Sequence, residues 1–209
     1  MSKKPFWEKS YKNKNLIDTY LCGQPSSEFY DLIKLLPRNV KVLDLGCGDG
    51  RNAIFLAENG FDVRAVDISM AGIEKLNHLA RIKDLHIEME RRDMRDYVFK
   101  GSYDLIIAHG CLHLIERSYW IRLIKSIKSR TRTGGYNVIA VFTDTLPPPA
   151  DLKDFTVGLF REGELFEIYQ DWQIILQKSY IKEDEHPGSI KHRHPINKIV
   201  AKKLRDGSR

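Results

Sequence analysis

VLDLGCGDGRN, residues 42–52, is the stretch that decides the fold. An apolar strand pattern runs into three glycines at alternate positions, and a helical pattern follows from Arg51. A glycine-rich turn between a strand and a helix lets the backbone approach a ligand closely, because glycine has no Cβ. The stretch therefore predicts a β-α unit with a binding turn at the carboxyl end of its strand.

The rest of the chain alternates between strand and helix patterns on either side of this turn. Alternating units of this kind predict a parallel sheet with helices on its faces. The last two expected strands have no helix pattern between them, so they should pair antiparallel across a polar loop, residues 181–195. We expect strands at residues 40–45, 61–67, 85–89, 103–108, 136–142, 171–180 and 196–204. We expect helices at 51–59 and 162–170, one capped by Ser69, and one that buries Trp120, Leu123, Ile124 and Ile127. The predicted fold class is α/β, a three-layer Rossmann-like seven-stranded mostly parallel sheet with a C-terminal antiparallel hairpin.

The charge of the glycine turn indicates what it binds. In a dinucleotide-binding turn the third glycine stands at the sixth position of the motif, where this chain has Arg51. Asp44 and Asp49 add two carboxylates, which would repel a diphosphate and attract a cation. S-adenosylmethionine fits this demand, because it carries a sulfonium and an amino group and has no phosphate. We therefore expect S-adenosylmethionine, with S-adenosylhomocysteine as the product, in preference to NAD.

Two further carboxylates follow the next strands. Asp67 closes the second expected strand, 21 residues after Gly46, where it can accept hydrogen bonds from both ribose hydroxyls. Asp93 and Met94 follow the third strand, as an adenine acceptor and an apolar wall would. Each aspartate alone is typical of a turn or cap, but their order at successive strand ends favours a binding site.

Several segments together resemble a known family. LDLGCGDGRN, VDIS, RRDM and YDLIIAHGCLHLI are similar to the motifs of class I S-adenosylmethionine-dependent methyltransferases, and the resemblance covers nearly the whole chain. GGYNVI, FTVGLFREGEL and YQDW resemble the tellurite-resistance (TehB-like) methyltransferases within that class. The resemblance implies an enzyme that transfers a methyl group.

The resemblance also implies roles for single residues. The glycines would face the methionine part of the cofactor, and His109 would lie near the transferred methyl group. The N-terminal aromatic segment resembles a cofactor cap, in which Tyr20 is the candidate contact, whereas Trp7 and Tyr11 equally suit an apolar surface. Residues 1–36 are then a capping segment, 37–204 the methyltransferase domain and 205–209 a basic tail. The expected cofactor-binding residues are Tyr20, Asp44, Gly46, Gly48, Gly50, Arg51, Asn52, Asp67, Ile68, Asp93, Met94 and His109.

Histidines supply the candidate catalytic groups. Histidine is the side chain best suited to accept a proton near neutral pH, and Lys191–His194 reads KHRH in the expected polar loop. Arg193 offers a planar donor fork for an oxyanion, and His192 or His194 would orient or deprotonate the acceptor. The alternative is a solvated basic turn. We name His192, Arg193, His194 and His109 as catalytic candidates, and we expect no metal site.

Composition limits the remaining possibilities. The chain has 209 residues and a net charge of +6, but residues 1–14 carry +4 and residues 191–209 carry +6, which leaves −4 between them. Basic ends argue only weakly for nucleic acid. Three separated cysteines and no apolar N-terminal stretch favour a reducing, cytoplasmic compartment with no membrane contact. We expect a small-molecule acceptor, either a tellurite- or selenite-type oxyanion or a small thiol, hydroxyl or amine, and a monomer or homodimer. The rivals are an RNA or protein methyltransferase and a non-catalytic cofactor-binding module.

Overall fold

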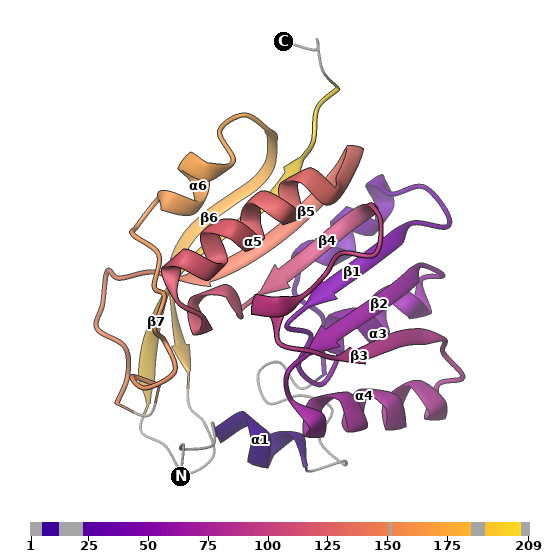
Figure 1. The fold of residues 1–209 in the computed structure, drawn as a ribbon, viewed down its shortest axis with the longest axis horizontal. Coiled ribbons are helices and arrows are strands. Elements are labelled where there is room, and N and C mark those ends of the chain that lie inside the picture. The colour runs from indigo at the N-terminus through magenta and orange to yellow at the C-terminus, as the bar shows by residue number, and fades with distance from the viewer. Residues whose placement is uncertain (1–5, 13–22, 151, 185–190, 206–209) are drawn as a thin grey trace. The chain divides into compact units, whose positions relative to one another are not determined.

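The computed structural model describes residues 6–12, 23–150, 152–184 and 191–205. The chain divides into two compact units, residues 1–98 and 99–209. Each unit contains its own strands and helices, most of which are labelled in Figure 1. None of the helices in the described ranges has the length and hydropathy needed to cross a membrane.

The first unit is a parallel β-α array. Its strands are β1 (Lys41–Leu45), β2 (Asp62–Asp67) and β3 (Ile87–Arg91), in the order β3-β2-β1. Val42 is level with Val63, and Val63 with Ile87, so the three strands run in parallel register. The helices are α1 (Phe6–Tyr11), α2 (Glu28–Leu32), α3 (Arg51–Glu58) and α4 (Met70–Ile82), with 3-10 turns η1 (Ile33–Leu35) and η2 (Met94–Asp96).

The helices of this unit begin and pack as their sequences predict. The Ser69 hydroxyl caps α4 by accepting a hydrogen bond from the Gly72 N–H at 3.0 Å. Leu56 of α3 and Leu76 of α4 are fully buried with Leu43 and Leu45 of β1. The apolar strand runs and one face of each helix therefore form the core of the unit.

The second unit combines one parallel and two antiparallel strand pairs. β4 (Tyr103–His109) lies parallel to β5 (Thr131–Phe142), β7 (His192–Lys202) is antiparallel to β5, and β6 (Gln173–Asp184) is antiparallel to β7. Between them come η3 (Leu112–Leu114), α5 (Arg117–Arg130) and α6 (Glu164–Ile168). α5 lies along β4 and β5 in Figure 1 and buries Trp120, Leu123, Ile124 and Ile127, as predicted.

The predicted architecture is confirmed and some boundaries are corrected. The seven strands of the described residues are parallel except at the C-terminal hairpin. β6 extends to Asp184 and β7 begins at His192, so the prediction of a polar loop over residues 181–195 was wrong. Cross-strand hydrogen bonding extends the hairpin through polar residues, because an edge pair needs an apolar sequence on one face only. The KHRH histidines consequently lie on a strand.

Candidate functional site

The glycine turn of the first unit lies at the carboxyl end of β1. The N–H groups of Gly46 and Cys47 both donate to the carbonyl oxygen of Val66, at 2.8 and 3.1 Å, which fixes the turn against β2. Gly50 has a φ of 87°, and a Cβ there would lie 2.2 Å from a methyl carbon of Leu76. Only glycine fits at this position, which explains the early third glycine of the motif.

Tyr11 of α1 lies directly over this turn. A Cβ on Gly48 would stand 2.6 Å from the Tyr11 hydroxyl oxygen, and a Cβ on Gly72 would stand 3.3 Å from a Tyr11 ring carbon. The tyrosine therefore packs between the turn and the first turn of α4. Of the two open interpretations of Tyr11, this contact favours a cover for the turn. Tyr20, the other aromatic candidate, lies outside the described residues.

Asp67 at the end of β2 is bound to the turn. Its two carboxylate oxygens accept hydrogen bonds from the N–H groups of Gly48 and Ser69, both at 2.8 Å. Burial raises the pKa of Asp67, and the two N–H donors act in the opposite direction by stabilising the ionised form. A carboxylate has about four acceptor sites, so Asp67 retains acceptor capacity for a ligand hydroxyl.

Asp44 is a buried carboxyl group at the end of β1. Burial raises the pKa of Asp44 to about 7; the nearby Arg51 charge acts against this shift and the Asp67 charge adds to it. Among the described residues, none hydrogen-bonds its Oδ2 atom. Burial, followed by the charges of Asp67, Asp44 and Asp49, also raises the pKa of the Cys47 thiol. A cation placed here would stabilise the ionised form of Asp44.

Asp49 does not add a free negative charge to the turn. Its carboxylate forms an ion pair with the Lys75 ammonium at 2.7 Å, and both side chains are almost fully buried. Lys75 lies on the buried face of α4 beside Leu76. The prediction that both aspartates would present charge to a ligand was therefore wrong for Asp49, because a buried carboxylate is stable only when it is paired.

The residues after the glycines hold the neighbouring chain segment. The Arg51 guanidinium donates to the Gln24 carbonyl oxygen at 3.3 Å and to the Ser26 hydroxyl at 3.2 Å. The Asn52 side-chain oxygen accepts from the Ser26 N–H at 3.1 Å. Both side chains thus tie residues 24–26 to the start of α3. Ile68 is 54% exposed and follows Asp67 directly.

Asp93 and Met94 follow β3, as predicted, and both are half-buried. The Asp93 carboxylate caps η2 through the Arg95 N–H at 2.9 Å and forms an ion pair with the Arg95 guanidinium at 2.6 Å. Partial burial acts to raise the pKa of Asp93, but the hydrogen bonds from the Arg95 side chain and N–H and the Arg95 charge together lower it. If Asp93 accepts a hydrogen bond from adenine, it does so with an oxygen that already accepts a hydrogen bond from Arg95.

Four rings gather at the corresponding edge of the second unit. His113, Phe142 and His194 are stacked, with ring centroids 3.9 and 4.3 Å apart, and His192 meets His194 edge-on at 4.6 Å. The predicted pair His192 and His194 is thus brought together. His109 ends β4, level with Ala140 of β5, two residues before Phe142.

Arg193 and His113 differ from the prediction made from the sequence. Arg193 is exposed and, by the alternation of a strand, lies on the opposite face of β7 from His192 and His194. It stands across from Glu183 of β6, a cross-strand pair of opposite charge. His113, which the candidates did not include, is buried in the stack. The described ranges contain no group of three or more side chains suited to hold a metal ion.

Comparison with known proteins shows the family to which the chain belongs. The family of the tellurite resistance protein TehB matches the chain over residues 8–194. A probable S-adenosyl-L-methionine-dependent methyltransferase TehB of Haemophilus influenzae is 35% identical, over 72% of this chain and 54% of that protein. Hemagglutinin 1 of Eikenella corrodens is 35% identical, over 65% and 44%.

A solved structure supports the same relationship. The crystal structure of TehB from Haemophilus influenzae aligns with a TM-score of 0.76 at 28% identity, covering 86% of this chain and 62% of that one. The chain spans about half the length of the curated relatives named above. On the family match over most of its length, the chain belongs to the TehB family of tellurite resistance proteins.

Proposed function

We propose that the chain binds S-adenosylmethionine at the glycine turn of the first unit and transfers its methyl group to a small molecule. The observation that carries the proposal is Asp44, a buried carboxyl whose Oδ2 atom has no hydrogen-bond partner among the described residues. A buried carboxyl in that state is stabilised by a cationic ligand. The name of the Haemophilus relative supports the same cofactor.

Each end of the cofactor has matching groups in the first unit. Gly46, Gly48 and Gly50 allow the methionine part to approach the backbone, and Asp44 attracts its positive charge. Asp67 accepts hydrogen bonds from the ribose hydroxyls while it holds Gly48. Asp93, Met94 and Ile68 contact the adenine, and Arg51 and Asn52 keep the turn in place through Ser26. Tyr11 covers the turn, which supports a capping role for residues 1–36.

The second unit holds the candidate catalytic histidines. S-adenosylmethionine brings an electrophilic methyl group, so the protein has only to align the acceptor and remove any proton it carries. His109, His192 and His194 lie at the carboxyl edge of β4 and β5, where ligands of such sheets bind. Arg193 lies on the opposite face of β7 from His192 and His194, so an oxyanion bound by Arg193 would not meet these histidines.

Formation of S-adenosylhomocysteine tests the proposal. The full chain is incubated with S-adenosylmethionine and, separately, tellurite, selenite, thiols, alcohols and amines, and the product is measured by chromatography. We expect product with at least one acceptor, and at least tenfold less with Asp67→Ala at subsaturating cofactor. The exposed Asp62 at the start of β2 provides the control, since Asp62→Ala leaves the turn intact.

Two outcomes distinguish the rivals. Cofactor binding without turnover on any acceptor would identify a non-catalytic module. RNA binding that weakens steeply with salt, together with RNA-dependent turnover, would identify an RNA methyltransferase. Cys47 and Cys111 are buried and form no disulfide among the described residues, which supports a reducing, cytoplasmic setting.

A further inference from the structure

The glycine turn of the first unit packs on one face of α4. A Cβ on Gly72 would stand 2.7 Å from the carbonyl oxygen of Gly48, so the backbone of the turn lies directly on the helix. A Cβ on Gly50 would stand 2.2 Å from a methyl carbon of Leu76, so the end of the turn lies on the next helical turn. Residues four apart share one face of a helix. The first two turns of α4 therefore support the glycine turn.

Lys75 belongs to the same buried face of α4 and contacts the turn through its charge. Its ammonium group binds the Asp49 carboxylate at 2.7 Å. Asp49 stands between Gly48 and Gly50 in the chain. The ion pair therefore joins the second half of the turn to the helix beneath it.

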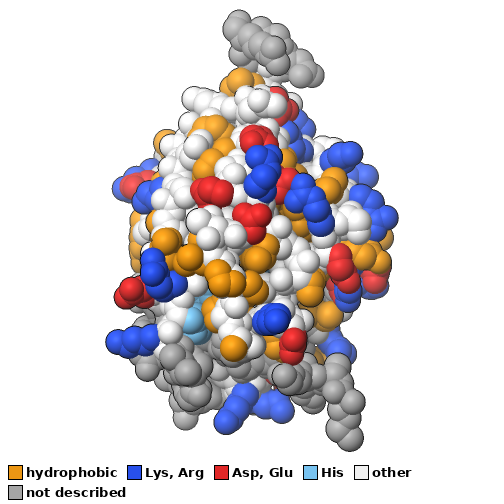
Figure 2. All heavy atoms as spheres, turned by 90° about the vertical axis from the view of Figure 1, so that its left-hand side faces the viewer, with side chains coloured by type: hydrophobic (Ala, Val, Ile, Leu, Met, Phe, Trp, Pro, Cys, Tyr) orange, Lys and Arg blue, Asp and Glu red, His pale blue; other side chains and the backbone are white. Residues whose placement is uncertain are grey.

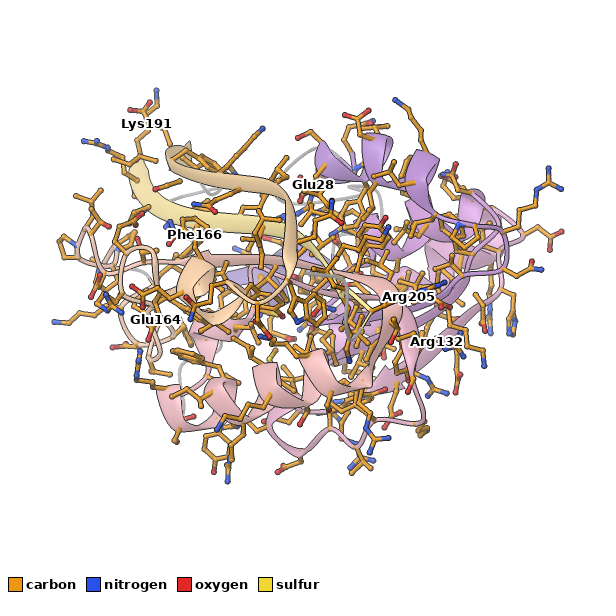
Figure 3. All side chains as sticks on the ribbon, turned by 90° about the horizontal axis from the view of Figure 1, so that it is seen from above. Glu28, Arg132, Glu164, Phe166, Lys191 and Arg205 are labelled. Carbon is orange, nitrogen blue, oxygen red and sulfur yellow. The ribbon has the colours of Figure 1, made fainter. Side chains whose placement is uncertain are left out.

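Burial distinguishes this ion pair from the charges on the surface. Figure 2 shows Lys and Arg side chains beside Asp and Glu side chains on the outside of the molecule, where water solvates both charges. The exposed Lys191 extends outward in Figure 3. The side chains of Lys75 and Asp49 are only 0% and 4% exposed. A buried charge is stable only beside its partner, so each of these two groups holds the other in place.

The backbone of the turn is of the kind that needs such an anchor. Its glycines are in the left-handed region, with φ values of 68°, 59° and 87° for Gly46, Gly48 and Gly50. Glycine loses more conformational freedom on ordering than any other residue. β2 holds the first half of the turn, through the Val66 carbonyl oxygen and the Asp67 carboxylate. The ion pair of Asp49 and Lys75 holds the second half from α4.

We propose that Lys75 is a positioning residue for S-adenosylmethionine: through Asp49 it holds the glycine turn in the conformation that receives the cofactor, without touching the cofactor itself. The inference rests on the proposed function and adds a residue to its donor site. A turn that is ordered before binding loses less conformational freedom when the ligand binds, and the ligand therefore binds more tightly.

A purely electrostatic role of Lys75 predicts a different result. Lys75 also neutralises Asp49, so a change in the pair alters the charge near the turn and the attraction for a cation. S-adenosylmethionine carries a sulfonium charge that S-adenosylhomocysteine lacks, whereas the two compounds share their amino acid and ribose groups. An effect of charge therefore changes the ratio of the two affinities. An effect of turn geometry weakens both affinities by the same factor.

A double variant separates positioning from general stability. Lys75→Met alone leaves the Asp49 carboxylate buried without its cation, which is strongly destabilising. Asp49→Asn combined with Lys75→Met removes both charges at nearly constant side-chain size, so no charge is left buried without a partner. We therefore expect the double variant to fold and to lose only the ion pair that holds the turn. Asp49→Asn alone, which keeps an oxygen acceptor for Lys75, is the milder second variant.

Calorimetric titration of the full chain with S-adenosylmethionine, and separately with S-adenosylhomocysteine, measures the two affinities. We expect the double variant to raise both Kd values at least tenfold, and Asp49→Asn alone to raise both at least threefold. The ratio of the two Kd values should stay within threefold of the wild-type ratio. Wild-type Kd values in both variants would overturn the positioning role. A change confined to S-adenosylmethionine would also overturn it, in favour of an effect of charge.

Hydrogen exchange of the cofactor-free chain distinguishes failure of this inference from failure of the proposed function. The backbone N–H groups of residues 46–52 are followed by mass spectrometry, since exchange reports local opening. We expect at least threefold faster exchange in both variants than in the wild type. Unchanged exchange overturns the positioning role alone. Absence of binding of either compound to the wild type overturns the proposed function, and with it the role of Lys75 toward the cofactor.

A second ion pair of the first unit provides the matched control. Lys83, at the end of α4, binds Glu58, at the end of α3, at 2.6 Å, and the two side chains are 38% and 39% exposed. The pair lies at the ends of both helices that are remote from the turn. Lys83→Met combined with Glu58→Gln should leave both Kd values within twofold and the exchange of residues 46–52 unchanged. Weakening of both affinities by as much as in the Asp49 and Lys75 double variant would overturn the specific role of Lys75.

Discussion

The carboxyl edges of the two units are built from different chemistry. In the first unit, backbone N–H groups and the carboxyl groups of Asp44 and Asp67 surround a glycine turn. In the second, the imidazole rings of His113 and His194 stack on the two sides of the Phe142 ring. The edge of the first unit therefore offers backbone donors and carboxyl groups to a ligand, whereas the edge of the second unit offers ring faces and imidazole nitrogens.

The two edges also respond to pH with opposite sign. Burial favours the protonated form of Asp44, so raising the pH lowers the contribution of Asp44 to the free energy of unfolding. Burial favours the neutral form of His113, so lowering the pH lowers the contribution of His113 to the free energy of unfolding.

Asp44→Asn should produce the largest change in stability. The pKa of Asp44 is about 7 in the folded chain against an ordinary value of 3.8, so the folded state binds more protons between these pH values. The contribution of Asp44 to the free energy of unfolding of the wild type therefore falls by about 3 kcal/mol between pH 5 and pH 8. Urea unfolding should show the variant more stable at pH 8, with little difference at pH 5. An equal difference at both pH values would mean that Asp44 is not responsible.

His113→Asn should flatten the acid side of the stability profile. The pKa of His113 is about 3 in the folded chain against 6.5, so the unfolded state binds the extra proton and stability falls as the pH drops below 6.5. At pH 5, protonation of His113 in the unfolded chain lowers the free energy of unfolding by about 2 kcal/mol. Urea unfolding from pH 5 to pH 8 measures the slope, which should decrease in the variant. A slope identical to that of the wild type would refute the buried neutral histidine.

Asp67→Ala should weaken cofactor binding with little effect on the ring stack. Removing the carboxylate leaves the N–H of Gly48 and the ribose hydroxyls without their acceptor, which costs about 1.4 kcal/mol or tenfold in Kd. Calorimetric titration with S-adenosylmethionine measures the change, and Asp62→Ala is the matched control. Identical affinity in wild type and variant would remove Asp67 from the site.

Gly50→Ala and Gly60→Ala separate packing from backbone strain. Both glycines have positive φ, but an added Cβ meets Leu76 at 2.2 Å in one case and nothing within 4 Å in the other. We expect Gly50→Ala to destabilise the chain by about 1 kcal/mol more than Gly60→Ala in thermal unfolding. Equal destabilisation would show that Leu76 relaxes freely.

The sequence predicted most of the fold because its signals are local. The run Val42–Asn52, the cap at Ser69 and the buried stripe of α5 each depend on neighbours within a few residues, and all are confirmed. The start of β7 was missed, since His192, Arg193 and His194 are polar and precede Pro195. Their pairing with β6 depends on residues that stand across the hairpin, which no local pattern reveals.

The candidate site was predictable where it follows the strand ends. The positions of Asp44, Asp67 and Asp93 came directly from the order of the strands. The partner of Asp49 is 26 residues away, although a lysine on the apolar stripe of α4 was an available signal. The stack of His113 on Phe142 had no comparable signal, because its members meet only after β5 and β7 pair.

The central prediction is that the turn at residues 46–50 binds S-adenosylmethionine. Calorimetry with the full chain should detect S-adenosylmethionine binding with one site per chain, weakened in Asp67→Ala and unaffected by excess NAD. Saturable binding of NAD that Asp67→Ala abolishes, with no heat from S-adenosylmethionine, would contradict it.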